Sequence, residues 1–103
     1  MTDVWNEPMP AKLAAILVGI QSPDTMQAFL RDVMTEKELR EIGARLRAAE
    51  MLYGNATYAA IVKETKLSSR TIARISEWMQ HGAGGYLVVL NETHPHVSPV
   101  DVG

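Results

Sequence analysis

Residues 57–79, TYAAIVKETKLSSRTIARISEWM, carry the pattern that decides the fold of this 103-residue chain. Thr57 and Ser68 are of the residue types that cap helix N-termini, and an apolar periodic segment follows each of them. The pattern predicts a short helix over residues 58–65, a tight turn, and a second helix over residues 69–80. The apolar side chains that such a pair must bury are Ile61, Leu67, Ile72 and Ile75.

A helix pair of this kind leaves the start of its second helix projecting outward, which is typical of a helix-turn-helix that binds DNA. The major groove is about 12 Å wide and admits one helix. Hydroxyl groups at a helix start suit phosphates, an arginine suits guanine, and an alanine suits a thymine methyl group. We therefore predict a helix-turn-helix over residues 57–81. The residues expected to face DNA are Thr57, Ser68, Ser69, Arg70, Ala73 and Arg74.

Two positions depart from the common form of this motif. Lys66 occupies the turn position that commonly holds glycine, and Val62 occupies a position that is commonly smaller. A left-handed backbone at Lys66 would cost about 1 kcal/mol. The pattern therefore leaves an alternative open, a helical protein-interaction module that does not bind DNA.

The N-terminal third of the chain predicts two helices. After the turn-rich residues 1–10, Ala11–Ile20 is almost entirely apolar and predicts a helix buried on most sides. Ser22 and Pro23 suit the first positions of a second helix, which we expect to stop near Met34.

The longest helix is expected between these helices and the helix pair. Thr35 and Glu38 form a capping box at its start, and Gly54-Asn55 is expected to end it. Glu41 and Arg45 are spaced for an ion pair on its exposed face. The fold class is therefore all-α, a multi-helix bundle with a helix-turn-helix towards its C-terminus.

The C-terminal part gives weaker signals. Tyr86–Leu90 contains two valines and predicts a short strand or a docked extended segment. Residues 91–103 are polar and contain proline, so we expect a disordered tail. Residues 1–90 would then form a single helical domain.

Charge is distributed unevenly along the chain. The chain as a whole has a net charge of −2, whereas residues 57–81 carry four basic and two acidic side chains. Salt confines the field of exposed charges to about 10 Å, so a basic tip can bind phosphates in front of an acidic body.

Composition restricts the remaining functions. The chain has no cysteine, which excludes disulfides and agrees with a cytoplasmic location. Its longest apolar run, Leu13–Ile20, is too short to span a membrane. His81, His94 and His96 lack an acidic partner at helical spacing, so no metal site is expected. No nucleophile–base pair is visible, so no enzymatic activity is expected either.

Residues 34–79, MTEKELREIGARLRAAEMLYGNATYAAIVKETKLSSRTIARISEWM, resemble the Trp repressor family. The shared features are the T-x-x-E start of the long helix, the pair Arg45 and Arg47, the glycine turn, and the ending T-I-x-R. The segment HGAGGY at residues 81–86 resembles the YerC/YecD-type branch of that family.

The resemblance implies an intertwined all-helical homodimer, in which the N-terminal helices of each chain wrap around the other. The apolar Ala11–Ile20 helix agrees with such an assembly. The two recognition helices would contact successive major grooves, about 34 Å apart, on a roughly palindromic operator. The expected partners are double-stranded DNA and a second copy of the chain. The expected role is transcription regulation, most simply repression.

The resemblance also implies a corepressor site for L-tryptophan. By similarity, its residues are Thr35, Arg45, Thr71 and Arg74. The two arginines would flank the indole, Thr71 and Arg74 would meet the carboxylate, and Thr35 would lie near the amino group. However, Ile75 stands where the family keeps glycine, and Trp78 stands where it keeps serine. We expect these larger side chains to fill the space that an indole needs, so no cofactor is predicted and L-tryptophan is not expected to bind. A different small-molecule effector stays an open alternative.

Overall fold

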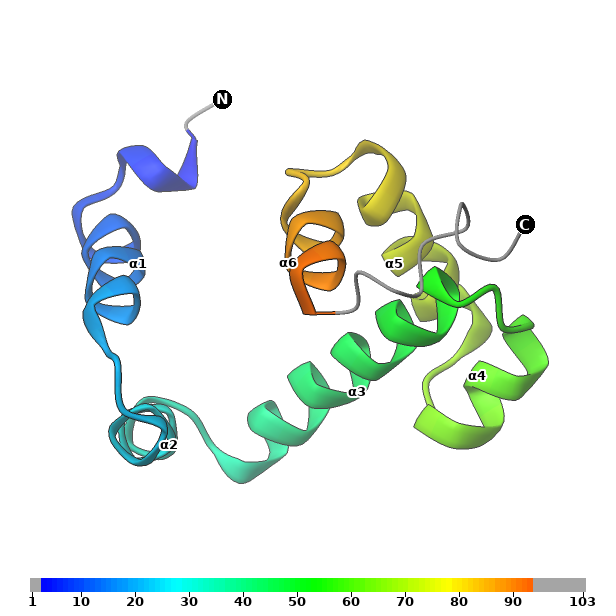
Figure 1. Ribbon diagram of the computed structural model, residues 1–103, viewed down its shortest axis with the longest axis horizontal. Helices are drawn as coiled ribbons and strands as arrows, with labels where there is room; N and C mark the ends of the chain where they lie inside the picture. The colour runs from blue at the N-terminus through cyan, green and yellow to red at the C-terminus, as the bar shows by residue number, and fades with distance from the viewer. Residues whose placement is uncertain (1–2, 94–103) are drawn as a thin grey trace. The chain divides into compact units, whose positions relative to one another are not determined.

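The computed structural model describes residues 3–93, and every regular element in that range is a helix (Figure 1). The elements are η1 (Val4–Asn6), α1 (Pro8–Gly19), α2 (Pro23–Val33), α3 (Glu36–Tyr53), α4 (Tyr58–Thr65), α5 (Ser69–His81) and α6 (Gly85–Thr93). The all-α fold class predicted from the sequence is confirmed. Contacts divide the chain into two compact units, the first ending at Leu39 and the second beginning at Arg40, within α3.

Proline and capping side chains set the starts of both helices in the first unit. Pro8 and Pro10 lie in the first turn of α1, where a missing N–H is tolerated because those N–H groups have no helical partner. The prediction that this helix begins at Ala11 was therefore wrong by about one turn. The predicted cap of α2 is confirmed, because the Ser22 Oγ accepts a hydrogen bond from the Thr25 N–H at 3.3 Å.

The helices α1 and α2 bury no side chain within the first unit. Val18 of α1 is 85% exposed, and Trp5 of η1 is 59% exposed. Other large apolar side chains are also exposed in this unit, namely Val4, Met9, Leu13, Ile16 and Val33. An apolar helix is stabilised by burial, so the first unit lacks a core of its own.

The predicted capping box at the start of α3 is confirmed. The Thr35 Oγ1 accepts a hydrogen bond from the Glu38 N–H at 3.1 Å, and the Glu38 Oε1 accepts one from the Thr35 N–H at 2.8 Å. The bond from the Thr35 N–H lowers the pKa of Glu38 below its ordinary value. With 18 residues, α3 is the longest helix in residues 3–93, as predicted.

The end of α3 lies where the sequence predicts it, although the left-handed residue is Asn55 (φ 66°). The Ala56 N–H donates to the Met51 carbonyl at 2.9 Å, and the Asn55 N–H donates to the Leu52 carbonyl at 3.0 Å. This pair of bonds is a Schellman motif, which satisfies carbonyls left free at the helix end. Asparagine tolerates the left-handed region better than other residues with a Cβ.

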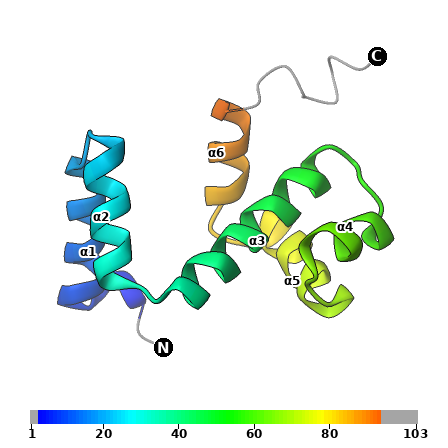
Figure 2. The same cartoon turned by 90° about the horizontal axis from the view of Figure 1, so that it is seen from below.

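The hydrophobic core lies in the second unit. Its buried members come from α3, α4, α5 and α6: Ala48, Ala49, Ile61, Ile72, Ile75, Met79 and Leu90. In both ribbon views α4 and α5 lie side by side, and α5 also contacts α6 (Figures 1 and 2). The helix pair is thus built around a core that this unit makes by itself.

The predicted strand or extended segment at Tyr86–Leu90 is wrong, because these residues form most of α6. Gly84 (φ 89°) turns the chain, and its carbonyl accepts the first bond of the helix from the Val88 N–H at 3.2 Å. Helical geometry brings Leu90 into the core, and this packing overrides the strand preference of the valines.

The predicted tail also begins later than expected, because residues 91–93 form the last turn of α6. The rest of the predicted tail lies outside the described residues. None of the helices within residues 3–93 is both long enough and apolar enough to cross a membrane.

Candidate nucleic-acid interface

The first helix of the pair, α4, is fixed at its start by Thr57. The Thr57 Oγ1 accepts a hydrogen bond from the Ala60 N–H at 3.2 Å, so the residue acts as the predicted cap. One turn further on, Ile61 is fully buried in the core of the second unit. The start of α4 therefore has a fixed orientation, and Thr57 itself is exposed.

The turn after α4 contains Lys66 in the left-handed conformation that the sequence analysis considered for this position. Lys66 has φ 64° and ψ 10°, and its N–H donates to the Val62 carbonyl at 2.9 Å. The Thr65 Oγ1 donates to the Ile61 carbonyl at 2.7 Å and accepts from the Leu67 N–H at 3.2 Å. Leu67 packs against the core. These contacts hold a backbone conformation that costs roughly 1–2 kcal/mol at a residue with a Cβ.

The second helix of the pair, α5, begins at Ser69 after its predicted cap. The Ser68 Oγ accepts a hydrogen bond from the Thr71 N–H at 3.1 Å and donates one to the Thr71 Oγ1 at 3.0 Å. The inner face of α5 is buried through Ile72, Ile75 and Met79. The hydroxyls of Ser68 and Thr71 are thus engaged with each other at the helix start.

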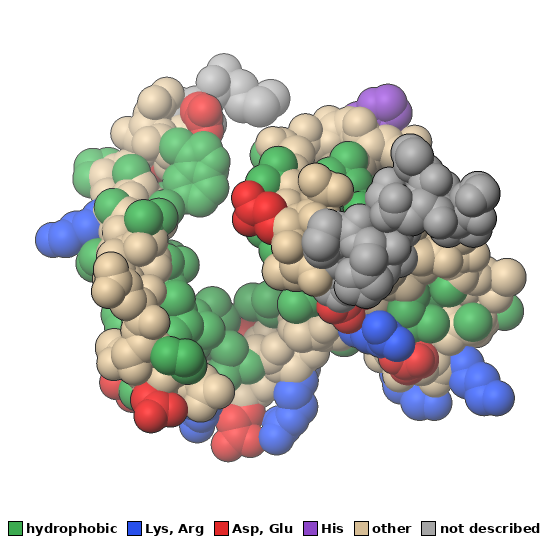
Figure 3. Space-filling model, viewed as in Figure 1, with side chains coloured by type: hydrophobic (Ala, Val, Ile, Leu, Met, Phe, Trp, Pro, Cys, Tyr) green, Lys and Arg blue, Asp and Glu red, His purple; other side chains and the backbone are tan. Residues whose placement is uncertain are grey.

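The outer face of α5 carries the remaining residues predicted to contact DNA. Ser69, Arg70, Ala73 and Arg74 are all exposed, and their spacing places them on one side of the helix. Within residues 3–93, neither Arg70 nor Arg74 forms an ion pair. Lys and Arg side chains gather around the end of the second unit that carries α4 (Figure 3). All six predicted residues therefore lie in one helix pair, and four of them share the exposed face of α5.

An ion pair that the sequence did not predict joins α3 to this helix pair. The Arg47 guanidinium donates to the Glu64 carboxylate of α4, and it also contacts Glu50 at 3.3 Å. The hydrogen bond with Glu64 raises the pKa of Arg47, and the same bond lowers the pKa of Glu64. The predicted pair between Glu41 and Arg45 does not form within the described part of the chain.

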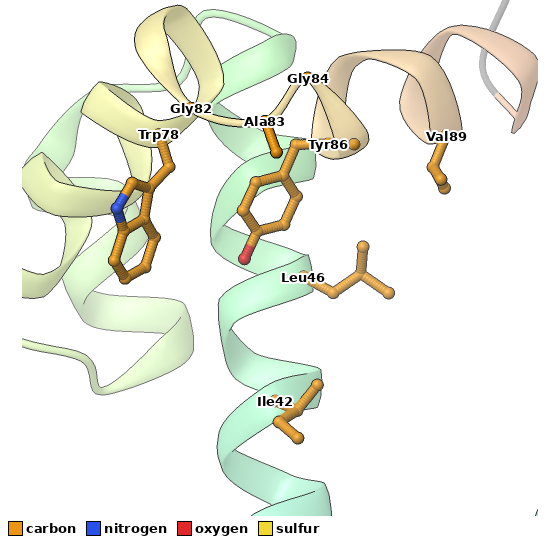
Figure 4. Close-up of a pocket in the computed structure, with 9 residues that line it drawn as sticks. Ile42, Leu46, Trp78, Gly82, Ala83, Gly84, Tyr86 and Val89 are labelled. Atoms are coloured by element: carbon orange, nitrogen blue, oxygen red, sulfur yellow. The ribbon is translucent and has the colours of Figure 1, made fainter. Parts of the chain in front are cut away.

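An apolar cavity of about 800 Å³, open to the surface, lies between α3, α5 and α6 (Figure 4). In Figure 4 the Tyr86 ring of α6 lies between the Trp78 indole of α5 and the Leu46 side chain of α3. The lining residues are Ile42, Leu46, Trp78, Gly82, Ala83, Gly84, Gly85, Tyr86 and Val89. The sequence did not predict this cavity, because it requires the helical form of α6.

Two glycines shape the rim of this cavity. The Gly82 N–H donates to the Trp78 carbonyl at 2.8 Å, and a Cβ at Gly82 would lie 2.4 Å from that carbonyl oxygen. Gly84 has φ 89°, a conformation that residues with a side chain rarely adopt. The chain therefore leaves α5 and enters α6 through two positions that require glycine.

The residues proposed by similarity for a tryptophan site lie elsewhere. Arg45, Thr71 and Arg74 do not line the cavity, and Thr35 belongs to the first unit, where it caps α3. Ile75 is fully buried in the core, whereas Trp78 is 42% exposed. No group of three or more His, Asp or Glu side chains within residues 3–93 could hold a metal ion. His94 and His96 lie outside the described residues.

The helix pair within an all-helical chain places the protein among those with a helix-turn-helix. Comparison with known proteins identifies the family. The family model described as "Trp repressor protein" matches residues 11–94, which is well over half of the chain. The chain therefore belongs to the Trp repressor family.

Individual relatives agree with this assignment. The chain is 28% identical over 75 residues to the uncharacterized protein YerC of Bacillus subtilis, and the match covers 73% of this chain and 72% of YerC. A crystal structure of a TrpR like protein from Eubacterium eligens has a TM-score of 0.81 at 26% identity, over 86% of this chain and 92% of that one. A solved structure from Staphylococcus aureus shares the fold, with a TM-score of 0.80 at 23% identity over 89% and 95% of the two chains.

Proposed function

We propose that this protein is a sequence-specific DNA-binding regulator, most simply a repressor, that inserts α5 into the major groove of a palindromic operator. The observation that carries the proposal is the division of α5 into two faces. Its inner face is fixed in the core by Ile72 and Ile75. Its outer face presents Ala73 together with Arg70 and Arg74, neither of which has an ion-pair partner in residues 3–93. Such a regulator acts in the cytoplasm, where bacterial DNA lies, and is not an enzyme.

The residues of the pair have distinct expected roles. Thr57 and the N-terminus of α5 at Ser68 and Ser69 contact phosphates and set the register of the helix on the duplex. Because the Ser68 hydroxyl is engaged with Thr71, its contribution to phosphate binding comes through the backbone N–H groups at the helix start. Arg70 contacts guanine, and Ala73 meets a thymine methyl group. Arg74, one turn after Arg70, contacts a base or a phosphate.

A homodimer completes the proposal. The apolar side chains that α1 exposes in a single chain would be covered by a second copy, and two copies of α5 would then meet successive major grooves about 34 Å apart. In such a dimer the two units would together form the single helical domain that the sequence predicts for residues 1–90.

We also propose that DNA binding is independent of L-tryptophan. Ile75 is part of the core, and the chain already places an indole, that of Trp78, beside the helix pair. The four residues Thr35, Arg45, Thr71 and Arg74 are then free of a corepressor role.

The test is selection of bound sequences from a random duplex library at fixed salt, with and without L-tryptophan. We expect enrichment of one palindrome that tryptophan does not change. Enrichment only with tryptophan would contradict the effector-independent form of the proposal, and no enrichment in either condition would contradict sequence-specific binding.

A second candidate function is a helical protein-interaction module without DNA binding. The apolar cavity of about 800 Å³ between α3, α5 and α6 favours it, because an open apolar hollow can accept the apolar face of a partner helix. Salt separates the two functions. Binding to DNA weakens steeply with salt, with a slope set by the number of phosphates neutralised, whereas an apolar helix contact barely responds.

A further inference from the structure

The backbone at Lys66 is unusual for the residue that occupies it. Within residues 3–93, two residues other than glycine have positive φ, Asn55 and Lys66. Asparagine enters this region readily, whereas lysine has no local interaction that offsets the clash of its Cβ. Glycine at this position would satisfy the turn without strain. The geometry of the turn therefore does not explain why the chain has a lysine there.

The contacts around the turn show what fixes this conformation. The Thr65 hydroxyl bonds to the Ile61 carbonyl and the Leu67 N–H, and the Leu67 side chain packs against the core. None of these contacts involves the ammonium group of Lys66, whose side chain is exposed. Thr65 and Leu67 thus hold the strained backbone of Lys66, and the Lys66 ammonium group is left exposed to bind a ligand. Strained residues that their neighbours hold in place are often found at functional sites.

The charges near Lys66 leave it without a partner in the described part of the chain. The nearest carboxylate in the sequence is that of Glu64, which Arg47 of α3 occupies through a hydrogen bond. Lys66 also lies two residues before Ser68, the cap of α5, and hence next to the N-terminus that the proposed function places against DNA. A compact ammonium group binds a phosphate as a point charge, whereas the planar guanidinium of Arg70 suits a base edge.

From these observations we propose that Lys66 is a DNA phosphate contact, additional to the six residues of the helix pair named above. This inference rests on the proposed function, because it requires α5 to lie in the major groove. The contact anchors the turn between α4 and α5 to the backbone of the duplex. It raises affinity for every sequence equally and adds no base preference.

The test measures affinity for a short mixed-sequence duplex between about 50 and 200 mM salt, a probe that reports phosphate contacts alone. Lys66→Gly is expected to weaken binding by about 3- to 10-fold per chain and to lower the log–log salt slope by about 0.9 per chain, since one neutralised phosphate is lost. Its melting temperature should be unchanged or higher, because the strain disappears. Lys66→Arg should keep the wild-type slope.

Two further variants make the outcome decisive. Lys66→Asn removes the charge but tolerates the left-handed backbone, so it replaces Lys66→Gly if that variant folds poorly. Lys37→Ala removes one exposed charge from the first turn of α3 and should leave the slope unchanged. A wild-type slope in Lys66→Gly and Lys66→Asn would overturn this proposal and leave the proposed function standing. A wild-type protein that binds no duplex would overturn both.

Discussion

The two units of this chain differ in how far they bury their apolar side chains. In the second unit, seven apolar residues from four helices are buried together, and the helix pair is built on them. In the first unit, η1, α1 and α2 bury no residue, although α1 is almost entirely apolar. Hydrophobic burial is the main favourable term in folding, so a single chain gains more of this stability from the second unit, because apolar residues of the first unit are at most partly buried.

This difference in burial assigns DNA contact and dimerisation, the two parts of the proposed function, to different units. The second unit positions the residues expected to contact DNA without help from another chain. The first unit presents exposed apolar side chains, which a second copy would cover in the proposed homodimer. Variants in the two units should therefore change different measured quantities.

The largest effect is expected from the core of the second unit. Ile72→Ala should lower the free energy of unfolding by about 2–5 kcal/mol, because the side chain is fully buried and its removal leaves a cavity. Urea denaturation at one fixed protein concentration would measure this loss, because the stability of a dimer depends on protomer concentration. Val62→Ala on the exposed side of α4 is the control and should change little. A loss at Val62 as large as that at Ile72 would contradict the comparison.

The next largest effect concerns the outer face of α5. Arg70→Ala should cost about 1–3 kcal/mol in binding to the selected operator and should relax base preference at one position per half-site. The melting temperature should stay unchanged, because Arg70 is exposed. Titration against a panel of single-base operator variants measures both quantities. Equal loss across the whole panel would make Arg70 a phosphate contact instead.

A smaller effect is expected from the first unit. Ile16→Ala should raise the dimer dissociation constant by about tenfold, because Ile16 is exposed in one chain and would be covered in two. Sedimentation equilibrium measures this constant, and Lys12→Ala on the same helix is the control. A wild-type protein that sediments as a monomer at micromolar concentration would refute the homodimer itself.

The smallest effect concerns the ion pair that joins α3 to α4. Arg47 holds the pKa of Glu64 below its ordinary value of 4.5, so the carboxylate binds protons less readily in the folded than in the unfolded chain. The pair therefore stabilises the fold above about pH 4.5, and this contribution is lost as the pH falls through the lower folded-state pKa. Both side chains are about half exposed, which keeps the effect small.

Glu64→Gln should remove this part of the pH dependence of the melting temperature. Glu77→Gln is the matched control, since Glu77 is exposed and forms no ion pair within residues 3–93. If both variants showed the same pH profile, the ion pair would have no measurable role in stability.

Local features of the fold could be predicted from the sequence because their causes lie within a few residues. The caps at Ser22, Thr35, Thr57 and Ser68 each bond to an N–H three residues away. Short-range hydrogen bonds of this kind are visible as residue types at fixed spacing. The helix α6 could not be predicted in this way, because the burial of Leu90 against distant helices decides it.

In the candidate site, too, features with local causes could be predicted and features with long-range causes could not. Its helix pair and the outer face of α5 follow from spacing, so the sequence predicts them together. The pair between Arg47 and Glu64 spans 17 residues and leaves no periodic signal. The apolar cavity was missed because it depends on where α6 packs.

The linker between α5 and α6 has a consequence for how this family can diverge. A side chain at Gly82 would overlap a backbone oxygen, and one at Gly84 would require a rare conformation, yet a Cβ at Gly85 would meet nothing within 4 Å. Mutational tolerance should therefore alternate within four residues. A randomised linker selected only for folding would keep glycine at positions 82 and 84 and accumulate other residues at position 85. Within the HGAGGY segment, Gly82 and Gly84 are therefore the residues whose identity indicates the same backbone geometry.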